Sequence, residues 1–122
     1  MPNTDPPTIS DDALNYKLHR AAETSWVDFS FFVGACPENI QSLSLLERKD
    51  GIAGIKMFMG SSTGSLLVSN DSDIDGVLKN GYRRVAVHCE DQKRLEERQD
   101  LIKGNPHAVS YTHLTLPTIY SV

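Results

Sequence analysis

The sequence has few cysteines, no long apolar run and no excess of basic residues, and each shortage excludes a class of protein. Cys36 and Cys89 are too few for a disulfide framework, so we expect two free thiols and a reducing, cytoplasmic setting. No apolar stretch approaches the length of a membrane span, which argues against a membrane partner. The formal net charge of -4 leaves no basic stripe for a nucleic acid.

The pattern of apolar residues predicts a parallel α/β protein. The 122 residues suffice for one modest domain with a core. Strict alternation of helices and strands favours parallel strands joined by right-handed crossovers. In such folds, ligands bind at the carboxyl ends of the strands. Helical periodicity is found near residues 11–24, 37–48, 71–80 and 92–103, and strand patterns near residues 27–33, 52–59 and 83–88.

One of these strands carries a lysine inside its apolar run. Residues 52–59 have the composition of a buried strand, and Lys56 lies among them without an acidic neighbour in sequence. A buried ammonium is costly, so this lysine must be paired, bound or uncharged, or its head must reach water at the strand end. Because strand side chains alternate, Ile52, Lys56 and Phe58 are expected on one face. The small residues of the loop 60–64 would let a ligand approach the backbone.

Two further polar residues lie near predicted strand ends. Asn3 belongs to a proline-rich opening loop that looks like the exit of a strand, and His88 ends the strand near residues 83–88. Three polar groups converging on one rim make that rim the candidate site. Glu90 and Asp91, directly after His88, could orient its ring or could begin the next helix.

The C-terminal residues differ in kind from the rest. Residues 109–122 carry no Asp, Glu, Lys or Arg and break the alternation of strands and helices. They resemble the translation of a sequencing adapter, although a short genuine strand has a similar composition. We therefore divide the chain into residues 1–108 and a non-native tail at residues 109–122, and leave the tail out of the fold prediction.

Three segments together resemble dihydroorotase, of the cyclic amidohydrolase superfamily. They are MPNTDPP at residues 1–7, GIKMFMGSSTG at residues 54–64 and VAVHCED at residues 85–91. The likeness runs through about residues 1–105. Hydantoinases and allantoinases share the lysine and the histidine but generally lack the Met-Pro-Asn-Thr opening, so the opening favours dihydroorotase.

The resemblance implies a zinc-dependent hydrolase built on a (β/α)₈ barrel. It implies a pair of zinc ions bridged by Lys56 after the lysine has become a carbamate, with His88 as a further ligand. Asn3 would hydrogen-bond the carboxylate of the substrate, dihydroorotate or N-carbamoyl-aspartate, in the reversible hydrolysis that belongs to pyrimidine biosynthesis. The parent enzyme would be a homodimer or a partner of aspartate transcarbamoylase.

The chain departs from that pattern in what it lacks. A (β/α)₈ barrel needs about 250 residues, so this chain would form about three strands of one. The His-x-His pair, a later histidine and the aspartate that carries the catalytic proton would lie outside it. We therefore expect an inactive internal fragment of an enzyme, without catalytic residues of its own, and with an inner wall that exposes Ile52 and Phe58. The alternatives are an allantoinase-like or hydantoinase-like enzyme, a non-catalytic scaffold subunit, and a small flavodoxin-like module that binds phosphate near residues 60–64.

Overall fold

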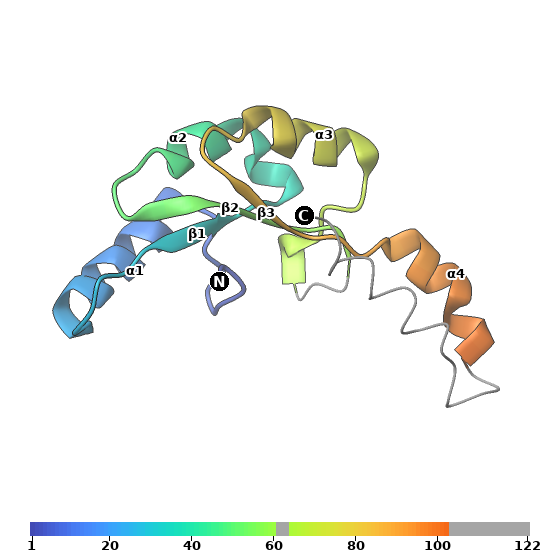
Figure 1. The fold of residues 1–122 in the computed structure, drawn as a ribbon, viewed down its shortest axis with the longest axis horizontal. Coiled ribbons are helices and arrows are strands. Elements are labelled where there is room, and N and C mark those ends of the chain that lie inside the picture. The colour runs from blue at the N-terminus through green and yellow to red at the C-terminus, as the bar shows by residue number, and fades with distance from the viewer. Residues whose placement is uncertain (61–63, 103–122) are drawn as a thin grey trace.

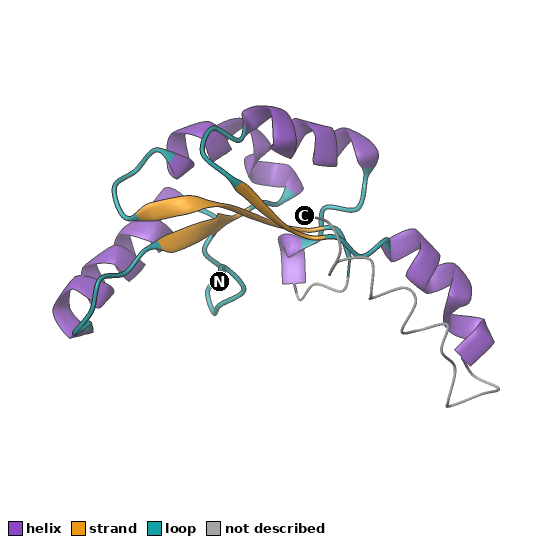
Figure 2. Cartoon of the chain, in the orientation of Figure 1, coloured by secondary structure: helices purple, strands orange, loops and turns teal. Residues whose placement is uncertain are grey.

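A three-stranded parallel sheet organises the chain (Figures 1 and 2). The computed structural model describes residues 1–60 and 64–102. Strands β1 (Phe31–Gly34), β2 (Ile52–Phe58) and β3 (Val85–His88) lie side by side in that order, and both pairs are parallel. The predicted order and direction of the strands are confirmed. The predictions for the tail at residues 109–122 lie outside the described residues.

The helices alternate with these strands as the sequence indicates. Ser10 begins the first helix, where its side chain accepts a hydrogen bond from the Ala13 amide at 3.3 Å, and Asn70 caps the third helix by accepting from the Ser72 amide at 3.0 Å. The segment after Pro37, predicted as one helix, divides into a 3₁₀ and an α-helical part. The elements are α1 (Asp11–Thr24), η1 (Pro37–Ser42), α2 (Leu43–Glu47), η2 (Gly64–Leu66), α3 (Asp71–Asn80) and α4 (Gln92–Ile102).

The core lies between the sheet and the helices on one of its faces. Figure 1 shows α2 and α3 over one face of the sheet, with the N-terminal loop and η2 on the other side. Leu14 of α1, Leu43 of α2 and Val77 of α3 belong to one buried cluster with Ile55 and Met57 of β2. Burial of such side chains supplies most of the free energy that holds the layers together. The expected helical layer on one side is confirmed for α1, α2 and α3, so a doubly wound flavodoxin-like sheet is not what forms.

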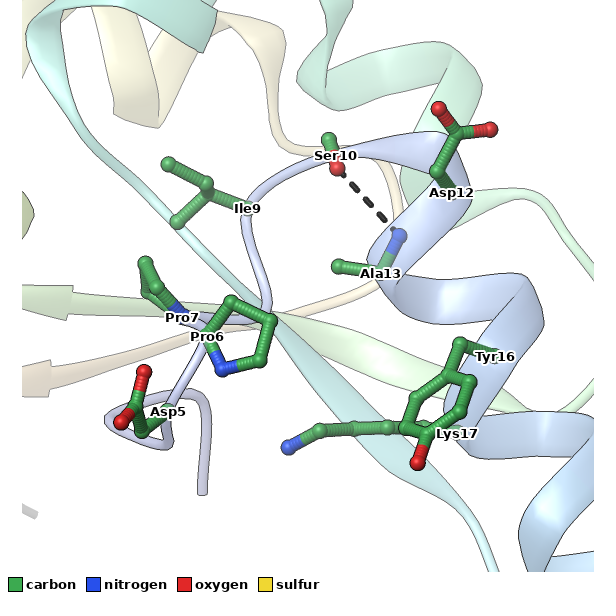
Figure 3. Close-up of a pocket in the computed structure, with 9 residues that line it drawn as sticks. All are labelled: Asp5, Pro6, Pro7, Ile9, Ser10, Asp12, Ala13, Tyr16 and Lys17. Carbon is green, nitrogen blue, oxygen red and sulfur yellow. Dashed lines mark hydrogen bonds between the residues drawn. The ribbon is translucent and has the colours of Figure 1, made fainter.

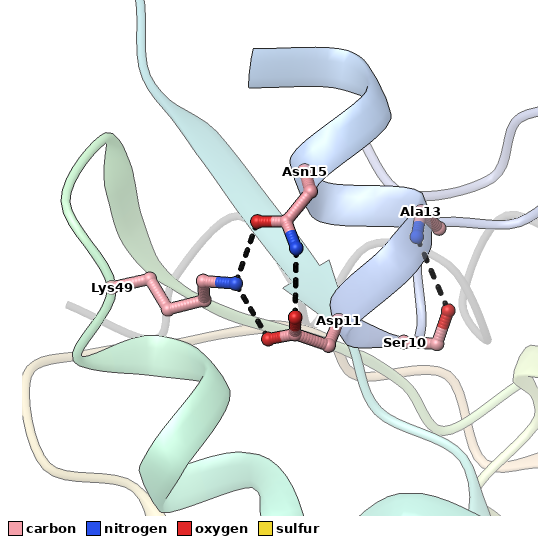
Figure 4. Close-up of polar contacts among 5 residues, drawn as sticks. All are labelled: Ser10, Asp11, Ala13, Asn15 and Lys49. Atoms are coloured by element: carbon pink, nitrogen blue, oxygen red, sulfur yellow. Dashed lines mark hydrogen bonds and ion pairs between the residues drawn. The ribbon is translucent and has the colours of Figure 1, made fainter. Parts of the chain in front are cut away.

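Polar contacts tie α1 to the turn that precedes β2 (Figure 4). Lys49 lies in that turn, and its Nζ donates to Asp11 Oδ1 at 2.5 Å and to Asn15 Oδ1 at 2.6 Å. Asn15 Nδ2 in turn donates to Asp11 Oδ2 at 2.8 Å. The Lys49 ammonium holds the pKa of the exposed Asp11 carboxyl below its usual range, chiefly through its hydrogen bond. The cluster fixes where the first helix meets the sheet.

The prediction that Ile52 and Phe58 stand exposed on an inner wall is wrong. The two side chains are 2% and 7% exposed. The register of β1 on β2 shifts, since Phe31 pairs with Ile52 whereas Phe32 pairs with Gly54. This extra residue in β2 is a β-bulge, which reverses the alternation before it, so Ile52 joins the core cluster on the helix side.

The first strand is shorter than the sequence suggests. Composition predicts a strand from residue 27, but Val27 is 76% exposed and β1 begins at Phe31, whose amide donates to the Gly51 carbonyl at 2.9 Å. A strand needs a partner for its backbone, and the partner strand begins only at Ile52. Along residues 1–60 and 64–102, no helix combines the length and apolar character that crossing a membrane requires.

Candidate functional site

Lys56 lies near the carboxyl end of the central strand, between two small residues. It pairs with Gly34 on β1 and with Ala86 on β3. Paired residues of parallel strands direct their side chains to the same face, and neither Gly34 nor Ala86 has a side chain beyond Cβ that could cover Lys56. A Cβ atom built on Gly34 would lie 2.9 Å from Pro2 Cβ and 3.0 Å from Leu66 Cδ2. The N-terminal loop and η2 therefore pack over this face next to the lysine.

The ammonium of Lys56 has no carboxylate partner among the residues that the structure describes. Its Nζ lies 4.9 Å from the centroid of the Phe58 ring, an arrangement that permits a cation–π contact. Partial burial lowers the pKa of Lys56, and the nearby Cys89 thiol acts in the opposite direction. The lowered pKa increases the share of neutral amine, which is the nucleophilic form.

His88 lies one strand over, on the same face as Lys56. It pairs with Phe58, two residues beyond Lys56, and the two rings are 5.9 Å apart between centroids. The side chain of His88 is 41% exposed, and its Nε2 lies 3.2 Å from Oε1 of the largely buried Glu90. The fold thus brings Lys56 and His88 to neighbouring positions at one end of the sheet, as the sequence predicts.

The two acidic residues after His88 have different roles. Asp91 Oδ1 accepts a hydrogen bond from the Arg94 amide at 3.0 Å, which makes it the residue that begins α4. Glu90 instead contacts the histidine ring. The sequence does not decide which of the two residues contacts the His88 ring and which begins the helix. That choice depends on the path of the chain after β3.

Asn3 is exposed on the N-terminal loop, and that loop is anchored to the end of β1. The Gly34 amide donates to the Thr8 carbonyl at 2.8 Å, and the Thr8 amide donates to the Pro2 carbonyl at 2.9 Å. Lys17 of α1 also holds the loop, since its Nζ donates to Thr4 Oγ1 at 2.7 Å. These bonds place the loop that carries Asn3 beside the strand next to Lys56. The described contacts do not join Asn3 itself to Lys56 or His88.

Two pockets lie outside the immediate surroundings of Lys56. The larger has a volume of about 480 Å³ and lies between the N-terminal loop and α1, with Pro6 and Pro7 on one side and Tyr16 and Lys17 on the other (Figure 3). It includes none of Asn3, Lys56 and His88. A smaller pocket of about 290 Å³ lies where β2 and β3 meet the first residues of α3 and α4, and Cys89 and Glu90 contribute to its wall.

The described residues do not form a metal site by themselves. Residues 1–60 and 64–102 contain no group of three or more His, Cys, Asp and Glu side chains placed to hold an ion. A catalytic zinc ion takes about three protein ligands. An imidazole and an amine that can become a carbamate are suitable donors, so Lys56 and His88 fit as two members of a larger ligand set.

Comparison with known proteins identifies the relatives of this chain. Dihydroorotase of Methanosarcina acetivorans is 33% identical over 115 residues, which cover 93% of this chain and 24% of the relative. Dihydroorotase of Methanosarcina mazei is 36% identical over 108 residues, which cover 86% of this chain and 23% of the relative. Allantoinases and an L-hydantoinase are also among the matches.

A solved structure agrees with these relatives. L-Hydantoinase (dihydropyrimidinase) from Arthrobacter aurescens superposes with a TM-score of 0.73 at 26% identity, over 85% of this chain and 24% of the other. The chain resembles a segment of a cyclic amidohydrolase. Its three strands and their helices are accordingly a partial (β/α)₈ barrel. The chain spans about a quarter of the length of the curated relatives it matches, and no family model matches it.

Sequence reasoning missed one buried carboxylate that shapes the site from the far end of the strands. Glu47 ends α2 and is fully buried. Its Oε1 accepts from the Arg83 and Arg84 amides at 2.8 and 2.9 Å, and its Oε2 accepts from the Tyr82 amide at 2.6 Å. These bonds fix where the chain enters β3. They therefore also fix the position of His88 along that strand. A glutamate at the end of an amphipathic helix is usually solvated, so the sequence carries no signal for it.

Proposed function

We propose that this chain belongs to a zinc-dependent dihydroorotase, which hydrolyses the ring amide of dihydroorotate to N-carbamoyl-aspartate and also catalyses the reverse closure. The observation that carries the proposal is the placement of Lys56, an amine without a carboxylate partner in the described part of the chain, on the same sheet face as His88. Relatives named dihydroorotase support it. So does the Met-Pro-Asn-Thr opening at residues 1–4.

Each of the three residues has a distinct part in the proposal. The neutral Lys56 amine would add to carbon dioxide and lose one proton, and the resulting carbamate, with one negative charge shared by two oxygens, would be the group through which Lys56 holds metal ions. His88 offers a neutral imidazole nitrogen to one of them. Bound zinc supplies Lewis-acid polarisation of the amide carbonyl and lowers the pKa of water. Asn3 donates a hydrogen bond from its amide to the substrate carboxylate.

A second candidate function is hydrolysis of a related cyclic amide. The allantoinases and hydantoinases among the relatives, together with the hydantoinase structure, support this alternative. The same two ligands would serve, because the cleaved bond is a ring amide in each case. The choice between substrates depends on groups that contact the rest of the ring, and Asn3 is our candidate for one of them.

The test compares the chain alone with a barrel that contains it. Residues 1–105 replace the matching segment of the Methanosarcina acetivorans dihydroorotase, and ring opening of dihydroorotate, allantoin and hydantoin is measured with zinc and bicarbonate. We expect turnover of dihydroorotate by the chimera and none by the 122-residue chain, which holds two of the proposed ligands and should bind zinc weakly. Lys56→Ala in the chimera should reduce turnover to background. Lys79→Ala, which removes an exposed lysine paired with Asp75, should leave turnover unchanged. Full activity with Lys56→Ala would show that the proposed site is wrong.

A further inference from the structure

The loop that carries Asn3 is built around one hydroxyl group. Thr4 Oγ1 donates to the Pro6 carbonyl at 2.8 Å and lies 3.1 Å from Thr8 Oγ1. It also accepts a hydrogen bond from Lys17 Nζ at 2.7 Å. A hydroxyl has one proton and two lone pairs, so its three shortest contacts match its full capacity for hydrogen bonding. The hydroxyl of Thr4 is therefore the point at which the loop and α1 are joined.

The backbone around Asn3 closes into a turn with buried ends. The Thr4 and Thr8 amides both donate to the Pro2 carbonyl at 2.9 Å. The side chains of Pro2 and Thr8 are fully buried. Asn3 itself is exposed, and its side chain makes no hydrogen bond to another described residue. The turn thus presents Asn3 outward, and the direction of its side chain depends on how the turn is held.

Lys17 links this turn to α1. Among the described hydrogen bonds, its bond to Thr4 is the one that joins residues 2–8 to that helix. The pocket of about 480 Å³ separates loop and helix beside this bond, with Pro6 and Tyr16 in its walls, so apolar packing does not fill that space (Figure 3). No carboxylate of the described residues lies within ion-pair distance of Lys17. Burial lowers the pKa of Lys17, and the Thr4 hydroxyl supplies the acceptor that a partly buried ammonium needs.

We propose that Lys17 is a positioning residue for Asn3: its hydrogen bond to Thr4 Oγ1 fixes the direction in which the loop presents the Asn3 amide to the carboxylate of the substrate. The inference rests on the proposed function for the substrate contact, whereas the link between Lys17 and the loop does not depend on it. Lys17 lies outside the groups proposed to hold metal ions. It should therefore act on substrate binding through Asn3 and leave the chemical step unchanged.

The first arm of the test needs neither substrate nor metal and uses the full 122-residue chain. Nitrogen-15 relaxation should give the backbone amide of Asn3 an order parameter typical of ordered backbone, about 0.85. Lys17→Met keeps the apolar stem but removes the donor, and should lower this value below about 0.6. Lys17→Arg retains a donor and should preserve it. Arg20→Met, which changes an exposed basic residue of the same helix, is the matched control and should leave the value unchanged.

A second variant removes the bond from its other side. Thr4→Val deletes the acceptor and should lower the Asn3 order parameter as Lys17→Met does. The Gly34 amide, which donates to the Thr8 carbonyl, should stay protected from hydrogen exchange in both variants. An Asn3 order parameter that is unchanged in Lys17→Met, or already low in the unsubstituted chain, would overturn the inference. Loss of the Gly34 protection in Lys17→Met would also overturn it, because the lysine would then hold the fold rather than the direction of Asn3.

The second arm measures kcat and KM for dihydroorotate in the chimera described above. Asn3→Ala should raise KM at least about tenfold, because it removes a hydrogen bond to a charged group. Lys17→Met should raise KM at least about threefold with kcat unchanged, and Lys17→Arg should restore KM. The double variant should be no worse than Asn3→Ala alone, since Lys17 acts through Asn3. A merely destabilised enzyme would instead lose active molecules, which lowers the apparent kcat and leaves KM unchanged.

The outcomes separate the positioning role from the proposed function. If Asn3→Ala raises KM and Lys17→Met does not, the positioning role is refuted while the proposed function stands. If Asn3→Ala leaves KM unchanged in a chimera that Lys56→Ala inactivates, the substrate contact of Asn3 is refuted and the positioning role with it. If the chimera does not turn over dihydroorotate, the proposed function is refuted, and the first arm alone decides whether Lys17 directs Asn3.

Discussion

The lysines of this chain differ in what surrounds their charge. Lys49 and Lys79 are paired with Asp11 and Asp75, each at 2.5 Å; the first pair is partly exposed and the second largely exposed. Lys56 has a phenyl ring and two small neighbours instead. Desolvation without a compensating charge penalises the ammonium form. The chemistry proposed for Lys56 therefore follows from the lack of a carboxylate partner for its ammonium among the described residues.

This difference predicts that folding changes the titration of Lys56. Burial lowers the pKa of Lys56, so its ammonium should lose its proton at a lower pH in the folded chain than in the unfolded chain. Since the folded state binds the proton less well than the unfolded chain, stability should rise with pH from the lowered pKa up to the unfolded value of 10.5. Carbon-13 NMR of labelled lysine Cε atoms, assigned with Lys56→Arg, measures the Lys56 curve in buffer and in denaturant. Coincident Lys56 curves in the two conditions would contradict the prediction.

The two thiols should also differ in reactivity. Cys36 is fully buried, and burial, followed by the neighbouring Glu38, raises its pKa from 9.0 to about 11. Cys89 is exposed. At pH 8 a thiol reagent should modify one cysteine in the folded chain and two in denaturant, and peptide mapping should identify Cys89. Because the Cys36 pKa is raised on folding, its contribution to stability is complete below pH 9.0 and is lost as the pH rises through about 11. Equal modification rates in the folded state would refute the assignment.

At the scale of elements, Glu47 connects α2 to the start of β3. The three amides that it accepts from would be buried without partners if the carboxylate were removed. An unsatisfied buried donor costs about 1–3 kcal/mol, so Glu47→Ala should lower the free energy of unfolding by about 3 kcal/mol or more. Glu47→Gln retains one acceptor oxygen and should cost less. Urea unfolding followed by circular dichroism measures both, and Glu97→Ala, on the exposed face of α4, should change stability by less than about 0.5 kcal/mol. If Glu47→Ala lowered the free energy of unfolding by no more than Glu97→Ala does, water would have to replace the carboxylate as the acceptor for the three amides.

The elements that could be predicted are those whose signal is local. Helices α1 and α3 have the predicted bounds, because acidic first turns and apolar spacing act within each segment. The start of β1 and the orientation of Ile52 depend on how two distant segments pair. A bulge of one residue reverses a face, and no single-segment pattern contains that information.

The candidate site shows the same division. Lys56, His88 and their shared face could be predicted, because alternation along parallel strands fixes direction once the strands are known. The Glu90 contact and the three bonds of Glu47 could not, since each joins a side chain to backbone or rings that folding brings near. These contacts depend on loop paths at the two ends of β3, where sequence periodicity ends.

The sheet is covered on both faces, but its two edge strands, β1 and β3, differ in whether their outer backbone groups are paired. At β1, the Gly34 amide donates to the Thr8 carbonyl, so the N-terminal loop covers part of that edge. At β3, the Ile55 and Met59 amides donate to the Arg84 and His88 carbonyls. The backbone groups of successive residues in a strand point in alternate directions. Val85 therefore directs its amide and carbonyl away from β2. Within the described residues β2 is the one strand neighbour of β3. An unpaired edge of this kind is a template for pairing with another chain.

We therefore predict that the chain self-associates through the outer edge of β3. Val85→Pro removes an amide that faces away from β2, at the first residue of the strand, where proline is tolerated. It should weaken self-association, measured by sedimentation velocity over a range of concentrations, at least about tenfold, while the circular dichroism spectrum is retained. Ala86→Pro is the matched control, because residue 86 directs its amide toward β2 and its loss should unfold the sheet instead. Unchanged association of a folded Val85→Pro chain would place the contact elsewhere, and the exposed Trp26 would then be the next surface to substitute.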